Sequence, residues 1–153
     1  MVDLTANKRT PIKRVQIDTP ALLNLVKHCR EADVATAQGF LMGVSQKINH
    51  ESVDSLLVTQ TMPKAKRAQM ADLMKTLENE SQRLMDTNEV GFYVNSRMGL
   101  AFSWDVLSSL LEATKKFKNS VFIVYDTSKA NFGLNPLKAY RLSEKAMGAL
   151  AQR

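Results

Sequence analysis

The hydrophobic positions of the chain recur with two different periods. Some segments alternate apolar and polar residues or are apolar throughout, as strands are, whereas others repeat an apolar residue every three or four positions, as helices do. Strands are predicted over residues 15–17, 38–48, 52–63, 89–94, 121–126 and 137–142. Helices are predicted over residues 20–30, 70–85, 104–114 and 143–153. This order predicts an α/β domain with a mixed sheet flanked by helices.

The first predicted helix has a clear start and one apolar stripe. Thr19 is expected to cap it, and Pro20 suits the first helical position because no hydrogen bond is lost there. Lys27 should face water, as should Arg30. His28 is next to Cys29 in the chain, and adjacent residues cannot share one face of a helix. His28 is therefore predicted to lie at the helix surface. The stripe that should pack on the sheet comprises Leu22, Leu23, Leu25, Val26 and Cys29.

Three segments define the centre of the expected sheet and a second helix. Residues 38–48 and 52–63 are expected to pair as antiparallel strands across a short turn. Residues 121–126 are rich in β-branched and aromatic types, which predicts a strand buried on both faces. Ser103 is expected to cap the helix that follows it. The buried side of that helix should comprise Val106, Leu107, Leu110, Leu111 and Thr114.

Two further segments differ in regularity. Residues 70–85 carry methionine and leucine side chains mostly on one helical face, which predicts a long amphipathic helix with an adaptable packing surface. Residues 127–136 contain Gly133 and Pro136 and are predicted to form an irregular loop or wide hairpin.

The composition favours one globular domain in a reducing compartment. The chain has 153 residues, of which 44% are hydrophobic and 24% charged, so it can bury a core without disulfides. We expect a flexible basic arm over residues 1–13 and one domain over residues 14–153. A lone cysteine, Cys29, and the lack of a signal-like or membrane-spanning apolar run favour a cytoplasmic protein.

The net charge of +6 permits a location close to nucleic acid, but its distribution argues against an RNA-recognition module. The basic residues form short scattered groups within residues 8–14, 64–67 and 115–118. Binding to RNA would call for one basic stripe with interleaved aromatic residues, and the sequence shows none. We therefore interpret these groups as solvated faces.

The sequence contains no recognisable catalytic or metal-binding motif. Its two histidines, His28 and His50, and its single Cys29 lack the short ligand spacings of a zinc site. There is no nucleophile elbow and no phosphate-binding loop. The glycines Gly39 and Gly43 lie in a predicted strand, where they are expected to permit close packing of a helix or a partner.

Four stretches of the chain resemble an MPN domain, with a match from Arg14 to about Ser143. They are T36-A-Q-G-F-L-M-G43, V90-G-F-Y-V-N-S-R97, V121-F-I-V-Y-D126 and L137-K-A-Y-R-L142. The resemblance implies a partial barrel flanked by helices, with the architecture of the cytidine deaminases. It also implies that the helix from residue 143 is the start of a C-terminal extension.

The resemblance also implies that the catalytic site is degenerate. Catalytic members of the family are JAMM metalloproteases, which hold zinc with a His-x-His pair and an Asp and use a Glu as base. Here Thr36 takes the place of that Glu, and Val94 and Ser96 take the places of the histidines. Trp104 stands for a supporting serine and Leu107 for the aspartate. We expect no catalytic residue, metal or cofactor, with apolar side chains filling the former cleft.

Among inactive members, the pattern YD-x-x-K-A-x-x-G-x-x-x-L-K-A-Y-R-L over residues 125–142 is most similar to an MPN subunit of eukaryotic translation initiation factor 3. The resemblance implies a non-catalytic, cytoplasmic scaffold that contacts the other subunits of this factor. Its MPN domain would pair with that of the f subunit, and the assembly would support initiation on the small ribosomal subunit.

Three alternatives stay open from the sequence. The chain is also compatible with an inactive MPN subunit of the proteasome lid or the signalosome. A hydrolase would require His28 or His50 to converge with a carboxylate in a cleft. An RNA-contacting module, including a peripheral rRNA contact, would use the basic arm and residues 64–67.

Overall fold

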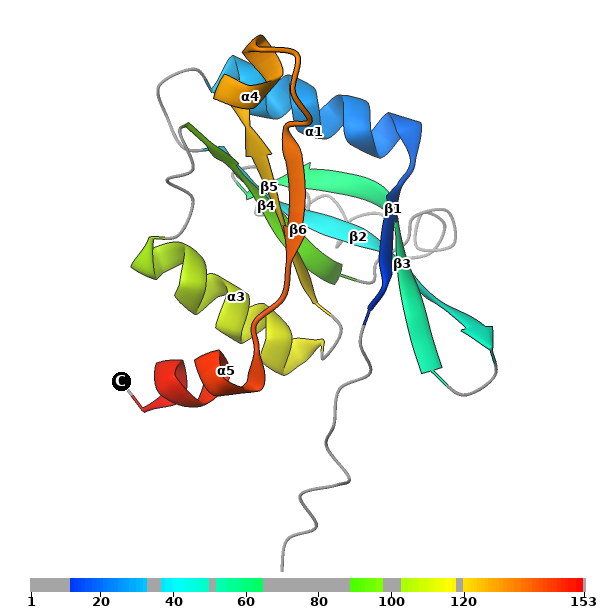
Figure 1. Cartoon of the computed structure of the whole chain (residues 1–153), viewed down its shortest axis with the longest axis vertical. Helices are drawn as coiled ribbons and strands as arrows, with labels where there is room; N and C mark the ends of the chain where they lie inside the picture. Colours follow the sequence, from blue (N-terminus) through cyan, green and yellow to red (C-terminus); the bar gives the residue numbers. More distant parts are fainter. Residues whose placement is uncertain are drawn as a thin grey trace, which may run out of the picture.

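A six-stranded mixed sheet carries helices on both faces (Figure 1). The computed structural model describes residues 12–32, 37–49, 52–64, 89–97, 103–117 and 120–152. The strands are β1 (Arg14–Ile17), β2 (Gln38–Asn49), β3 (Ser52–Pro63), β4 (Glu89–Ser96), β5 (Val121–Asp126) and β6 (Leu137–Tyr140). The helices are α1 (Thr19–Glu31), α3 (Trp104–Lys116), α4 (Thr127–Asn131) and α5 (Glu144–Ala151). All six predicted strands are present, whereas the arm up to residue 11 and the predicted helix over 70–85 lie outside the described residues.

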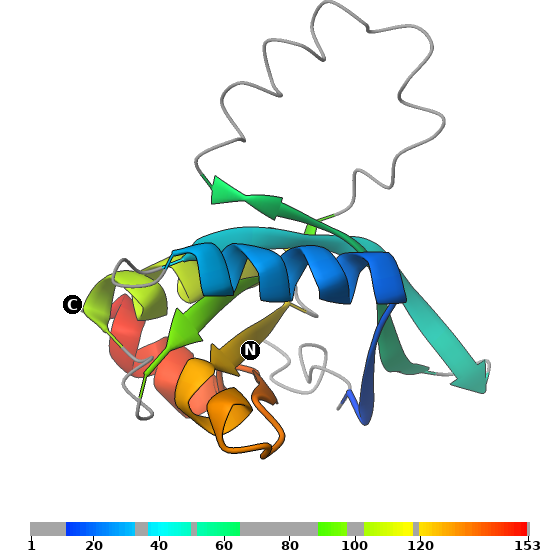
Figure 2. The same cartoon turned by 90° about the horizontal axis from the view of Figure 1, so that it is seen from above.

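The strand order is β1-β3-β2-β4-β5-β6. Strand β2 pairs antiparallel with both β3 and β4, and β5 pairs antiparallel with β6. The pairs β1–β3 and β4–β5 are parallel. The sheet curls into a nearly closed, barrel-like shape, which Figure 2 shows from above. The predicted α/β class, with a partial barrel flanked by helices, is confirmed.

The two faces of the sheet build two separate hydrophobic clusters. Helix α1 covers one face, and α3 and α5 cover the other (Figures 1 and 2). Successive residues of a strand point to opposite faces, so Tyr93 and Ile123 lie under α1 while Phe92 and Phe122 lie under α3. All six residues of β5 are buried, which confirms that this strand is covered on both faces.

Helix α1 has a different cap from the one expected, and its buried face is narrower than the predicted stripe. Its N-cap is Asp18 rather than Thr19, and the Asp18 side chain makes no capping hydrogen bond. The buried line runs through Ala21, Leu25 and Cys29, which are spaced four residues apart and so share one face. Leu23, which we included in the stripe, is 63% exposed, because it lies about half a turn from Leu25.

The connection between β5 and β6 is more ordered than the predicted irregular loop. It begins with α4, whose N-cap Asp126 accepts hydrogen bonds from the backbone N–H groups of Ser128 and Lys129. The helix ends at Asn131, and Gly133 just beyond it has a φ of 70°, a conformation that glycine adopts at low cost. The prediction missed α4 because its capping aspartate is also the last residue of a strand.

The two other helices begin where the sequence indicated. Ser103 accepts a hydrogen bond from the backbone N–H of Val106 at the start of α3, and Ser143 does the same from Ala146 at the start of α5. Each bond satisfies one of the amide groups that a helix leaves unpaired at its N-terminus. Both predicted starts are confirmed.

Gly39 and Gly43 permit close approach within the sheet rather than to a helix or a partner. A Cβ atom on Gly43 would overlap the carbonyl oxygen of Leu57 on β3. A Cβ atom on Gly39 would overlap the ring of Tyr93, its neighbour on β4. The expectation of a helix at these glycines is therefore wrong, and that of a partner stays a prediction.

Candidate functional site

Four of the five positions that the resemblance to an MPN domain assigns to a degenerate zinc site lie in β4 and in the first turn of α3. Val94 is 1% exposed and belongs to the cluster beneath α3, against which Leu107 also packs. Ser96 is two residues further along the same strand and is buried beside Asp126 on β5. Thr36, the fifth position, lies outside the described residues. The structure thus brings Val94 and Leu107 into one apolar cluster.

Trp104 does not fill this region as expected, because 48% of its side chain is exposed. The buried face of α3 runs through Val106, Leu110 and Ala113. Trp104 precedes Val106 by two residues, which corresponds to about 200° around a helix and points its side chain away from that face. Val94 and Leu107 are therefore the two apolar replacements that contribute to the core.

Ser96 differs from its apolar neighbours in having a buried hydroxyl. The Ser96 Oγ atom has no hydrogen-bond partner among the described residues. A single hydroxyl is a poor zinc ligand, since zinc sites use thiolate, imidazole and carboxylate groups. Within the described part of the chain, no three His, Cys, Asp or Glu side chains gather closely enough to hold a metal ion.

A second polar cluster, which the sequence did not reveal, connects α1 to the sheet. Nδ1 of His28 lies 2.6 Å from the hydroxyl oxygen of Tyr93, and the two rings meet edge to face. Asn95 accepts a hydrogen bond from the N–H of Ala37 and donates one to the carbonyl oxygen of Cys29. The prediction that His28 is a surface residue is therefore wrong, because its ring is half-buried and reaches the sheet.

This second cluster has the wrong properties for acid–base or nucleophilic catalysis. Burial raises the pKa of the Cys29 thiol to about 12 and also raises the pKa of Tyr93. A thiol with so high a pKa stays protonated at neutral pH and is a weak nucleophile. Tyr93 is fully buried, so a substrate cannot reach its hydroxyl group. We interpret the cluster as a structural link between α1 and β4.

Replacing Tyr93 with phenylalanine should therefore lower stability without disturbing the fold. The Tyr93→Phe variant removes the hydroxyl but keeps the ring, and we expect a loss of roughly 1–2 kcal/mol in the free energy of unfolding. Urea titration, monitored by circular dichroism, measures this loss in stability. The matched control is Tyr125→Phe, because the Tyr125 hydroxyl accepts a weaker, 3.4 Å bond from the exposed Arg30. Equal stability of the two variants would contradict our interpretation.

A cavity of about 150 Å³ lies between the sheet and α3. Its charged lining consists of Lys64 and Lys116 together with Glu89 and Glu112. Two cations and two carboxylates favour neither an anionic nor a cationic ligand, so the lining of the cavity does not indicate a class of substrate.

Among the helices of the described residues, we find no candidate for a membrane-spanning segment.

Comparison with known proteins shows sequence similarity between this chain and one subunit of a translation factor. It is 30% identical to the H subunit of eukaryotic translation initiation factor 3 from Arabidopsis thaliana, over 90% of this chain and 41% of that protein. The H subunit of Bombyx mori is 31% identical over 89% of the chain and 41% of that protein. The chain is thus similar in sequence to the H subunit of eukaryotic translation initiation factor 3. No family model matches it.

A third relative, the H subunit of Neurospora crassa, is 25% identical over 93% of the chain and 44% of that protein. The chain thus spans less than half the length of these three relatives. The similarity nevertheless extends along about nine tenths of this chain. The resemblance indicated by residues 125–142 is confirmed at the level of the H subunit.

Proposed function

We propose that the chain is an MPN-type domain that has lost its zinc site and acts as a non-catalytic scaffold subunit of translation initiation factor 3. The observation that carries this proposal is the similarity to three H subunits along about nine tenths of the chain. The barrel-like sheet with helices on both faces agrees with the architecture that an MPN domain implies. The names of these relatives support a role in translation initiation.

The loss of zinc is supported by the chemistry of the side chains at the former site. Valine and leucine have no lone pairs, so Val94 and Leu107 cannot coordinate a metal ion. Both side chains pack in the cluster beneath α3, where a charged or hydrated ion would be costly to bury. A domain that has no catalytic site to maintain gains stability when apolar groups fill such a cleft.

The proposed partners are the other subunits of initiation factor 3, with the MPN domain of the f subunit as the direct neighbour. The assembly would work in the cytoplasm on the small ribosomal subunit. An inactive MPN subunit of the proteasome lid or the signalosome would share the fold. The names of the relatives favour the initiation factor over these two assemblies.

Affinity purification of the tagged chain from a cytoplasmic lysate tests the assembly. We expect initiation factor 3 subunits, including the f subunit, to be recovered in constant proportion to the chain. Recovery of lid or signalosome subunits instead would reject this assignment but leave the MPN domain in place. A catalytic JAMM protein, tagged in the same way, serves as the control for non-specific recovery.

Metal analysis of the purified chain tests the dead site separately. After dialysis to remove unbound zinc, the zinc content should be well below one equivalent per chain. The reason is that the ligand positions carry Val94, Ser96 and Leu107. A catalytic JAMM domain treated in parallel should retain its zinc. One equivalent of tightly held zinc in our chain would mean that these positions are wrongly assigned.

A further inference from the structure

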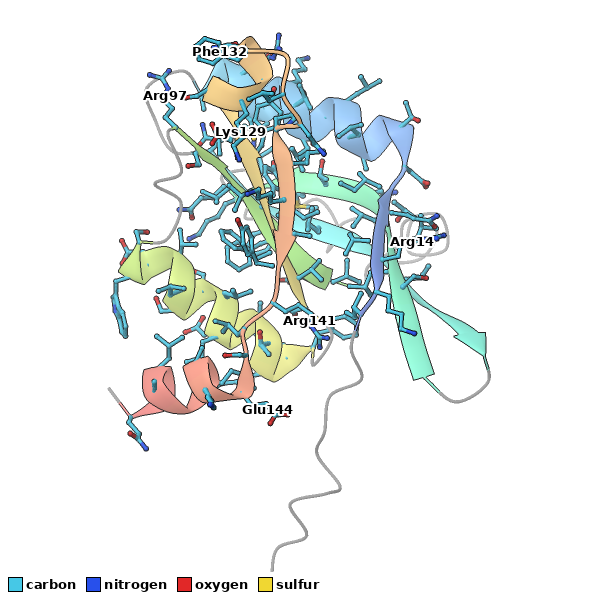
Figure 3. All side chains as sticks on the ribbon, in the orientation of Figure 1. Arg14, Arg97, Lys129, Phe132, Arg141 and Glu144 are labelled. Carbon is cyan, nitrogen blue, oxygen red and sulfur yellow. The ribbon has the colours of Figure 1, made fainter. Side chains whose placement is uncertain are left out.

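We draw no further inference here: the strongest candidate, the surface patch that Phe132 and Leu134 form on the turn after α4 (Figure 3), is exposed at both side chains, but nothing in the described part of the chain shows what covers it.

Discussion

Gly91→Ala should destabilise the domain by about 4 kcal/mol, which is most of the stability of a domain at the lower end of the usual range. Gly91 lies in β4 and pairs in parallel with Val121 of β5. A Cβ atom there would overlap the carbonyl oxygen of Val121, which is a backbone atom of the neighbouring strand. Its φ of 156° is also one that side chains disfavour. Thermal unfolding and urea titration of the purified variant measure the loss.

Gly148→Ala is the matched control for this change. Gly148 lies inside α5, and a Cβ atom on it would meet no atom within 4 Å. Alanine is the better helix former, so this substitution should raise stability by roughly 0.5–1 kcal/mol. If Gly91→Ala were as stable as Gly148→Ala, the close contact between β4 and β5 would not exist in solution.

Leu25→Ala should lower the free energy of unfolding by roughly 2–5 kcal/mol. Leu25 is fully buried in the cluster that joins α1 to the sheet. The substitution removes most of the side chain and leaves a cavity that the strands beneath α1 can fill only partly. Urea titration, with circular dichroism to detect loss of helix, gives the value.

The control for Leu25 lies on the same helix, two residues earlier. Leu23 is mostly exposed, so Leu23→Ala should change stability by less than about 0.5 kcal/mol. A large loss in Leu23→Ala with a small loss in Leu25→Ala would mean that α1 is rotated relative to the sheet. The pair therefore tests the orientation of the helix on which Leu23 was wrongly predicted to be buried.

Much of the fold could be predicted because short-range signals agree with the final structure. The uninterrupted apolar run of β5 indicates a strand covered on both faces, and it is. Ser103 and Ser143 are strong helix starters, and both make capping bonds. These features depend on residues close together in the chain, which is why pattern and propensity suffice.

The errors arise where contacts between distant residues decide the outcome. The face of α1 that is buried depends on the sheet beneath it, so Leu22, Leu23 and Val26 could not be ranked against Leu25 from spacing alone. His28 reads as a surface residue until Tyr93, which is distant along the chain, supplies a partner. The resemblance to an MPN domain puts Trp104 in the former cleft, although its place before the first buried residue of α3 directs it outward.

The two candidate sites differ in the same way. Val94 and Ser96 could be placed from the sequence, because the resemblance to an MPN domain identifies a strand that carries both. The link between α1 and β4 could not, because His28 and Tyr93 meet only when the helix packs on the sheet.

The outer strands of the sheet limit how a partner can join it. The edges are β1 and β6, and each has four residues. Arg14 and Gln16 on one edge and Lys138 on the other are exposed, and Pro136 precedes β6. Short, charged edges next to a proline resist the addition of another strand and so protect against edge-to-edge aggregation. A partner protein is therefore expected to dock on helices and turns rather than to extend the sheet.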